Sequence, residues 1–194
     1  MKSPSGVLHI RQLSAILLIK MLRLSSELNN INIISLRTGG PVAMAVLPII
    51  NPHNLKIIGW WCKAPGMTEN LVLMADDIRE INSKGIAIDD EEDLIAADDL
   101  VRHREILEIN YELIGKPVKT KHAKVGKVGD FSYNDGMFVQ KLYVERPLRK
   151  ILTTEDTILI DRNQIVEVTD HYILVRDTDI KSRESSPAID ALPA

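Results

Sequence analysis

The amino-acid sequence predicts a mainly β protein made of two similar small barrels, one following the other along the chain. Three stretches of the first half recur in the second half, in the same order, at separations of 85, 83 and 87 residues. Each half also contains about six short aliphatic runs separated by Gly, Pro and Asn, a pattern typical of small closed or nearly closed barrels. The unequal separations require only short loop insertions, which cost little free energy.

The repeat is spread over most of the chain. The matching stretches are 27–28 with 112–113, 42–61 with 125–144, and 71–88 with 158–175. The second match places Trp60 over Tyr143, and the third runs without a gap through alternating aliphatic residues. Because all three matches keep the same order, we interpret them as two copies of one unit.

Strands are expected where aliphatic runs lie between turn residues. In the first half these are residues 31–36, 42–46, 55–61, 71–73, 77–81 and 86–88. In the second half they are residues 117–118, 125–133, 138–144, 158–160, 165–168 and 172–175. The glycine pair at 39–40 and the Asn-Asp-Gly turn at 134–136 predict hairpins.

The remaining segments divide the chain into domains. Acidic residues 89–93 precede an apolar-periodic stretch, which predicts a short helical linker over residues 91–109. Apolar residues gather on one side of residues 7–28, so we expect an amphipathic helix there and an N-terminal helical extension over 1–20. An alternative is that 1–20 is an extension from an upstream start. The barrels then occupy 21–90 and 110–177, and 178–194 is expected to be a disordered tail.

Composition limits the function classes. The net charge of −3 and pI near 6.0 do not suggest the concentrated basic surface of a nucleic-acid-binding protein, and DNA is not expected as a partner. One cysteine, Cys62, cannot form an internal disulfide or a Cys-based zinc site, so a cytoplasmic location is expected. No transmembrane span, nucleophile motif or metal-ligand spacing is found, and residues 89–93 fit a solvated helix start better than a calcium loop. We therefore expect no catalytic, cofactor or metal site.

The adjacent tryptophans are the main candidates for a binding surface. Neighbouring residues of a strand point to opposite faces, so one tryptophan enters the barrel and the other faces outward. The outward side chain could anchor a partner, or it could pack against the sister unit or the linker. A basic loop adds further candidates. The candidate partner-binding residues are Trp60, Trp61, Tyr143, Arg146, Arg149 and Lys150.

The N-terminal segment could also contact a partner or lie on an anionic membrane surface. The candidate residues of this helix are Arg11, Leu13, Leu17, Lys20 and Arg23. Peripheral attachment to a membrane is therefore kept as an alternative to a fully cytoplasmic protein.

Several strings of the second unit resemble the PRC-barrel family. They are ELIGKPV at 112–118, KVGKV at 124–128, QIVEV at 164–168 and YILV at 172–175, and DIREI at 77–81 marks a more diverged first copy. The arrangement is similar to uncharacterised bacterial tandem PRC-barrel proteins.

The resemblance implies a non-enzymatic adaptor that binds a protein, since PRC-barrel domains act largely as binding modules. The family includes the cytoplasmic domain of the photosynthetic reaction centre H subunit, which has a transmembrane helix that is absent here. It also includes the C-terminal domain of a ribosome maturation factor, which carries a different N-terminal barrel, whereas the first unit here resembles a second PRC copy. The alternatives are a ribosome-associated or RNA-processing factor that contacts a ribosomal protein or the small subunit, and a peripheral membrane scaffold.

Overall fold

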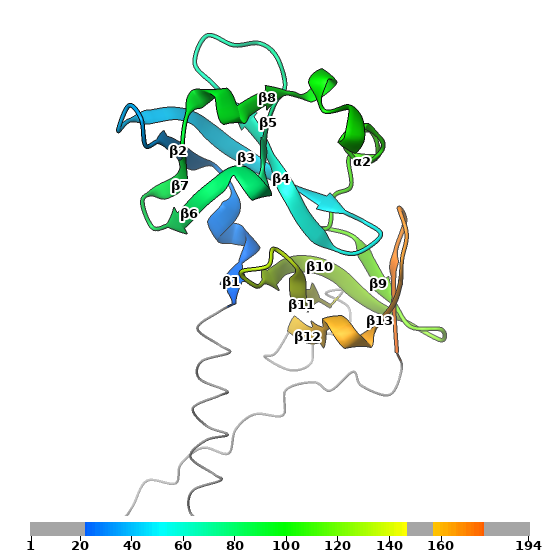
Figure 1. Ribbon diagram of the computed structural model, residues 1–194. Helices are drawn as coiled ribbons and strands as arrows, with labels where there is room; N and C mark the ends of the chain where they lie inside the picture. The colour runs from blue at the N-terminus through cyan, green and yellow to red at the C-terminus, as the bar shows by residue number, and fades with distance from the viewer. Residues whose placement is uncertain (1–21, 147–156, 177–194) are drawn as a thin grey trace, which may run out of the picture.

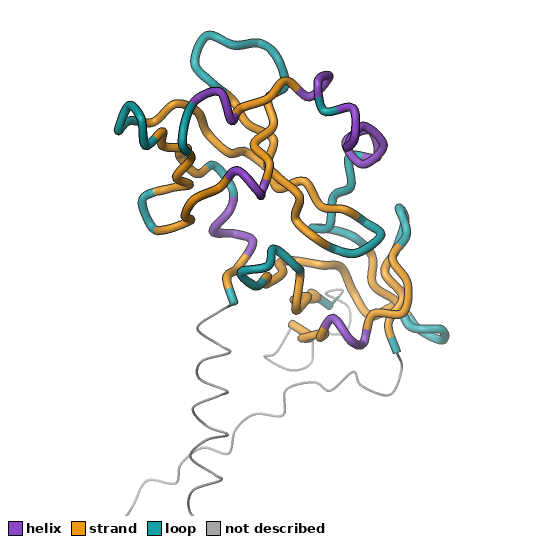
Figure 2. Tube along the Cα trace, viewed as in Figure 1, coloured by secondary structure: helices purple, strands orange, loops and turns teal. Residues whose placement is uncertain are grey.

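The computed structural model describes residues 22–146 and 157–176, which form two sheets of seven strands each (Figure 1). Strands make up most of this part of the chain and the helices are short (Figure 2). The predicted mainly β fold class is confirmed. The predicted tail at 178–194 lies outside the described residues.

The first sheet is formed by the first half of the chain. Its strand order is β6-β7-β2-β3-β4-β5-β8, with β2 and β7 parallel and the other neighbours antiparallel. The strands are β2 (Ile31–Ser35), β3 (Pro41–Asn51), β4 (Lys56–Lys63), β5 (Leu71–Met74), β6 (Ile78–Asn82), β7 (Gly85–Ile88) and β8 (Leu94–Ala96).

The second sheet repeats the order of the first six of these strands, and among the described residues it has no counterpart of β8. It runs β13-β14-β9-β10-β11-β12, again with one parallel pair, β9 with β14, and a short strand β1 pairs with β10. The strands are β1 (Arg23–Leu24), β9 (Pro117–Lys119), β10 (Lys124–Tyr133), β11 (Val139–Glu145), β12 (Thr157–Asp161), β13 (Ile165–Val168) and β14 (Ile173–Val175). The 3-10 turns η2 (Ala75–Asp77) and η7 (Arg162–Gln164) occupy the same place in the two sheets. The two halves therefore share one strand order.

The register of the repeat differs by one residue from the predicted alignment in β4 and β11. Trp60 faces Leu73 in the first sheet, and the corresponding pair in the second sheet is Leu142 with Ile160. Trp60 thus corresponds to Leu142, and Trp61 corresponds to Tyr143. The predicted match of Trp60 with Tyr143 is therefore wrong by one residue, because these two aromatic side chains lie on opposite faces of their sheets.

Alternation along the strands builds the core. In β12, Ile158 and Ile160 are buried whereas Thr157, Leu159 and Asp161 are exposed, as expected for a strand with one face covered. Equivalent alternation elsewhere places the aliphatic side chains inside. A single cluster of buried hydrophobic residues includes members from both sheets.

The turns of two hairpins join the sheets. The Ile57 N–H donates to the carbonyl oxygen of Met137 at 2.7 Å, and the Val139 N–H donates to that of Leu55 at 3.0 Å. Leu55 and Met137 both have positive φ, 51° and 61°, at corresponding places in their turns. The β3–β4 and β10–β11 turns therefore contact each other in a two-fold-like manner.

The linker predicted over 91–109 is helical in short separate pieces, not in one continuous helix, and the prediction is wrong at Leu94–Ala96, which form a strand. Residues Glu91–Asp93, Ala97–Asp99 and Val101–His103 form separate 3-10 turns, and only α2 (Arg104–Ile109) is α-helical. Leu94 and Ile95 instead lie in β8, where they pair with β5. Their apolar side chains suit a strand that covers a sheet edge as well as they suit a helix face.

The predicted amphipathic helix over 7–28 is wrong at its end. Residues 1–21 lie outside the described residues. Residues Arg23–Leu24 form β1 and Ser25–Leu28 form a 3-10 turn, η1, because this backbone pairs with Ser132 and Tyr133 of the second sheet. The start of the predicted first domain thus belongs to the sheet of the second.

Candidate partner-binding cavity between the two sheets

The structure distinguishes the two tryptophans. Trp60 is fully buried in the common core, with 0% of its surface exposed, and Trp61 is half-buried on the opposite face of β4. Trp60 is therefore a core residue and cannot contact a partner, which corrects its candidacy. Trp61 packs beside Ile49 and Leu107, so the linker covers part of it.

Trp61 also lines a cavity of about 270 Å³ between the sheets. The apolar wall of this cavity includes Leu47, Pro48, Trp61, Ile106, Ile114 and Phe131. These residues come from β3, β4, α2, the segment after α2 and β10, so both halves contribute. Leu47 is 48% exposed and Ile114 is 45% exposed, which leaves apolar surface open to a partner at the mouth.

Local backbone features place the wall residues. The pairing of β3 with β4 shifts between Ala45 and Leu47, and this bulge turns Leu47 outward. Asn110, with φ 46°, ends α2 in the left-handed region, so the chain reverses. The segment from Tyr111 to Ile114 then returns across the cavity mouth.

The cavity carries little charge. Glu112 is the one charged residue among those that line it, and Ser25, Asn29 and Asn110 supply the neutral polar groups. The Ser25 hydroxyl is itself used, since it donates a hydrogen bond to Asp130. Such a lining suits an apolar group, with a positive charge favoured beside Glu112.

Tyr111 lines the cavity with a buried side chain. It is 7% exposed, and the Lys116 Nζ lies 4.5 Å from the centroid of its ring. Burial raises the pKa of Tyr111 to about 12, and the nearby charge of Asp170 acts in the same direction. The phenol therefore stays neutral at physiological pH.

The other sequence candidates are not brought together with Trp61. Tyr143 is half-buried on β11, where it pairs with Asp130 and Leu159 in the second sheet. Arg146 is half-buried just after β11. The other candidates lie outside the described residues: Arg11, Leu13, Leu17, Lys20, Arg149 and Lys150.

Arg23 has a structural role in the described part of the chain, whereas the sequence predicted it to lie on an amphipathic helix. Its Nη1 donates to the carbonyl oxygen of Ile81 at 2.7 Å, and its residue pairs with Tyr133 across β1 and β10. Burial raises the pKa of Tyr133 to about 12, although the positive charge of Arg23 opposes this shift. The Arg23 side chain thus connects the two sheets.

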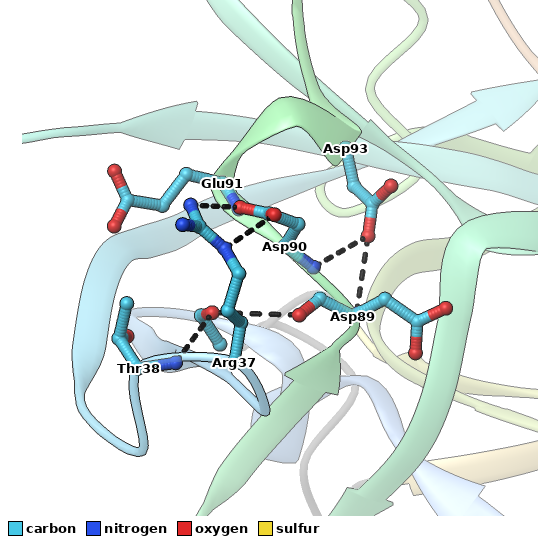
Figure 3. A network of polar contacts seen from close by, with 7 residues as sticks. Arg37, Thr38, Asp89, Asp90, Glu91 and Asp93 are labelled. Carbon is cyan, nitrogen blue, oxygen red and sulfur yellow. Dashed lines mark hydrogen bonds and ion pairs between the residues drawn. The ribbon is translucent and has the colours of Figure 1, made fainter.

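The acidic segment after β7 is engaged in local contacts (Figure 3). The Asp90 carboxylate accepts hydrogen bonds from Arg37, with Nη2 to Oδ1 at 2.6 Å, and Asp93 Oδ2 accepts from the backbone N–H groups of Asp89 and Asp90. Asp89 binds Arg79. These arginine hydrogen bonds lower the pKa of Asp89 and of Asp90. The carboxylates therefore stabilise a turn and are not arranged around an ion.

Within residues 22–146 and 157–176, no three His, Cys, Asp or Glu side chains come together as a metal site requires. In the same part of the chain, no helix has the length and hydropathy needed to cross a bilayer. Cys62 is buried, and burial raises the pKa of its thiol to about 12.

Sequence reasoning missed three residues of the cavity mouth: Leu47, Ile106 and Ile114. Leu47 lies two residues after Ala45, so the buried alternation of Ala43 and Ala45 predicts a buried side chain there, and only the bulge exposes it. No local signal marks Ile106 or Ile114, because their position depends on contacts between the halves.

No known family model matches the chain, and no characterised protein is significantly similar to it.

Proposed function

We propose that this chain is a non-enzymatic adaptor of the tandem PRC-barrel type, and that a protein partner inserts an apolar side chain into the cavity between its sheets. The observation that carries the proposal is the partly open apolar wall formed by Leu47, Trp61 and Ile114. The shared strand order of the two sheets supports the tandem assignment.

The size of the cavity fits this role. A space of about 270 Å³ accepts one or two large apolar side chains but not an extended substrate. Full burial of one Leu or Phe side chain contributes about 1.5 to 3 kcal/mol. Glu112 at the mouth favours a partner with a basic residue next to its apolar anchor.

The experiment compares partner recovery by two variants of the full chain. Leu47→Asp places a charge in the cavity mouth, and Leu36→Asp places the same charge at a site that is 60% exposed and does not line the cavity. We expect Leu47→Asp to weaken binding of the recovered protein at least tenfold, and Leu36→Asp to leave it within about twofold. Both variants should keep the wild-type circular dichroism spectrum.

Trp61 gives a direct readout of cavity filling. Its fluorescence should shift to shorter wavelength and become less accessible to acrylamide when the partner binds. The change should vanish in Trp61→Phe, which retains the buried Trp60 as an internal reference. Equal loss of binding in both aspartate variants, or an unchanged Trp61 signal in the complex, would contradict the proposal.

A further inference from the structure

The β9–β10 hairpin carries an unusual concentration of positive charge. Residues 113–129 contain five lysines and no Asp or Glu, although the chain as a whole has a net charge of −3. The lysines are Lys116, Lys119, Lys121, Lys124 and Lys127. The overall charge therefore conceals a strongly basic segment, because it averages this hairpin with the acidic residues in the rest of the chain.

The pairing of the hairpin concentrates this charge further. Lys119 and Lys124 are direct cross-strand neighbours in β9 and β10. Like charges at such positions repel one another and destabilise the pair. Among the described residues, none of the five lysines forms an ion pair with a carboxylate. A bound anion would relieve this repulsion.

The hairpin is locally ordered and projects from the second sheet (Figure 1). The Thr120 N–H donates to the carbonyl oxygen of Ala123 at 2.8 Å, and the Thr120 hydroxyl accepts from the Ala123 N–H at 3.1 Å. These bonds fix the turn, so Lys121, Lys124 and Lys127 are presented as exposed charges on a defined backbone.

Two aromatic rings hold the inner lysines without neutralising them. The Nζ of Lys119 lies 3.4 Å from the ring centroid of Tyr172. The Nζ of Lys116 lies over Tyr111 and donates to the carbonyl oxygen of Asp170 at 2.8 Å. The two rings and the backbone carbonyl are neutral, so these contacts themselves do not neutralise either ammonium charge, although the Asp170 carboxylate acts on Tyr111 close to Lys116.

We propose that this hairpin binds the phosphate backbone of single-stranded nucleic acid, without base specificity. Lysine ammonium groups suit phosphate oxygens as point charges, and a row of them contacts the backbone, not base edges. The hairpin contains no Arg, Asn or Gln, the side chains that most often read bases. The proposal is independent of the cavity and of its protein partner.

A bilayer surface is the less favoured anion. Peripheral membrane elements usually combine basic residues with large apolar side chains that enter the acyl boundary. The turn Thr120-Lys121-His122-Ala123 has no large apolar side chain to insert. The hairpin therefore offers charge without an apolar anchor.

The test is fluorescence anisotropy of the full chain with a labelled oligouridylate of about 20 nucleotides. If five lysines contact phosphates, the slope of log affinity against log salt is about −3.5, and binding weakens about 100-fold between roughly 50 and 200 mM KCl. The triple variant K121Q/K124Q/K127Q should reduce the slope by about 2 and weaken binding at least tenfold. The matched variant K56Q/K63Q/K84Q removes the same charge from the first sheet and should stay within about twofold.

Both variants are checked by thermal unfolding. K124Q alone should be at least as stable as the wild type, since it removes the Lys119–Lys124 repulsion, and it serves if the triple variant, which also removes Lys127 opposite Glu145, fails to fold. Equal weakening by both triple variants would overturn the proposal, as would the absence of binding at about 50 mM salt. Hairpin-dependent flotation with phosphatidylserine vesicles, without binding to the oligonucleotide, would overturn it in favour of a membrane.

Discussion

Replacing Leu142 by Ala tests whether the two sheets unfold as one body. Leu142 is fully buried on β11, where it pairs with Phe131 and Ile160, and it belongs to the cluster shared by both sheets. The change removes about three methylene equivalents, which contribute about 2.4 kcal/mol by transfer. The space left behind adds at most about 1.5 kcal/mol. The expected loss of unfolding free energy is therefore about 3 to 4 kcal/mol.

The assay uses the uneven distribution of tryptophan. Both tryptophans lie on β4 of the first sheet, whereas Leu142 lies in the second. Urea unfolding is followed by tryptophan fluorescence and by far-ultraviolet circular dichroism on the same samples. Because the hairpin turns and the core join the sheets, we expect both signals to shift to the same lower midpoint.

The control is Leu159→Ala on the neighbouring strand β12. Leu159 is 37% exposed, so its removal should cost less than about 1 kcal/mol. A fluorescence midpoint that does not move in Leu142→Ala, while circular dichroism shows a second transition, would refute the shared core. A loss below about 1 kcal/mol would refute the assigned burial of Leu142.

Three further predictions concern single positions. Burial raises the pKa of the Cys62 thiol to about 12, so at pH 8 its reaction with Ellman's reagent should be about 1000-fold slower than that of an ordinary thiol of pKa 9.0. The reaction should become fast when urea unfolds the protein. A fast reaction in the native protein would contradict the burial of Cys62. Gly126→Ala should cost at least about 2 kcal/mol in chemical unfolding, because a Cβ there would overlap a carbonyl oxygen of the facing strand, whereas Gly40→Ala meets no neighbour and should be tolerated. Arg37 lowers the pKa of Asp90, so this pair stabilises the fold above the ordinary carboxyl pKa of 3.8, and the contribution is lost as pH falls through the lower folded value. Arg37→Gln should therefore flatten the fall in melting temperature between about pH 5 and pH 2. An unchanged profile would show that solvent screens the pair.

The sequence predicted the strands because turn-forming side chains and aliphatic alternation act between residues that are close together in the chain. The predicted turn after Asn51 is formed by the Asn51 side chain, whose Oδ1 accepts from the His53 N–H at 2.9 Å. In the second half, Asn134 Oδ1 accepts from the Phe138 N–H at 3.0 Å. Aliphatic alternation then placed most of the core, as in β12.

Features that depend on distant pairing were not predicted. Leu94 and Ile95 were assigned to a helix because their spacing fits one, but the open edge of β5 holds them as a strand. The one-residue error between Trp60 and Leu142 arose for a similar reason, since the hairpin bulges set the register and leave no clear trace in composition. The cavity requires both halves, so no single stretch of sequence could reveal it.

The crossing of β1 to the second sheet bears on how the polypeptide is made. Arg23 and Leu24 leave the ribosome long before Ser132 and Tyr133, the residues with which they pair. β1 therefore cannot pair until β10, in the second half of the chain, has been synthesised. A chain that stops before β10 lacks the strand with which β1 pairs.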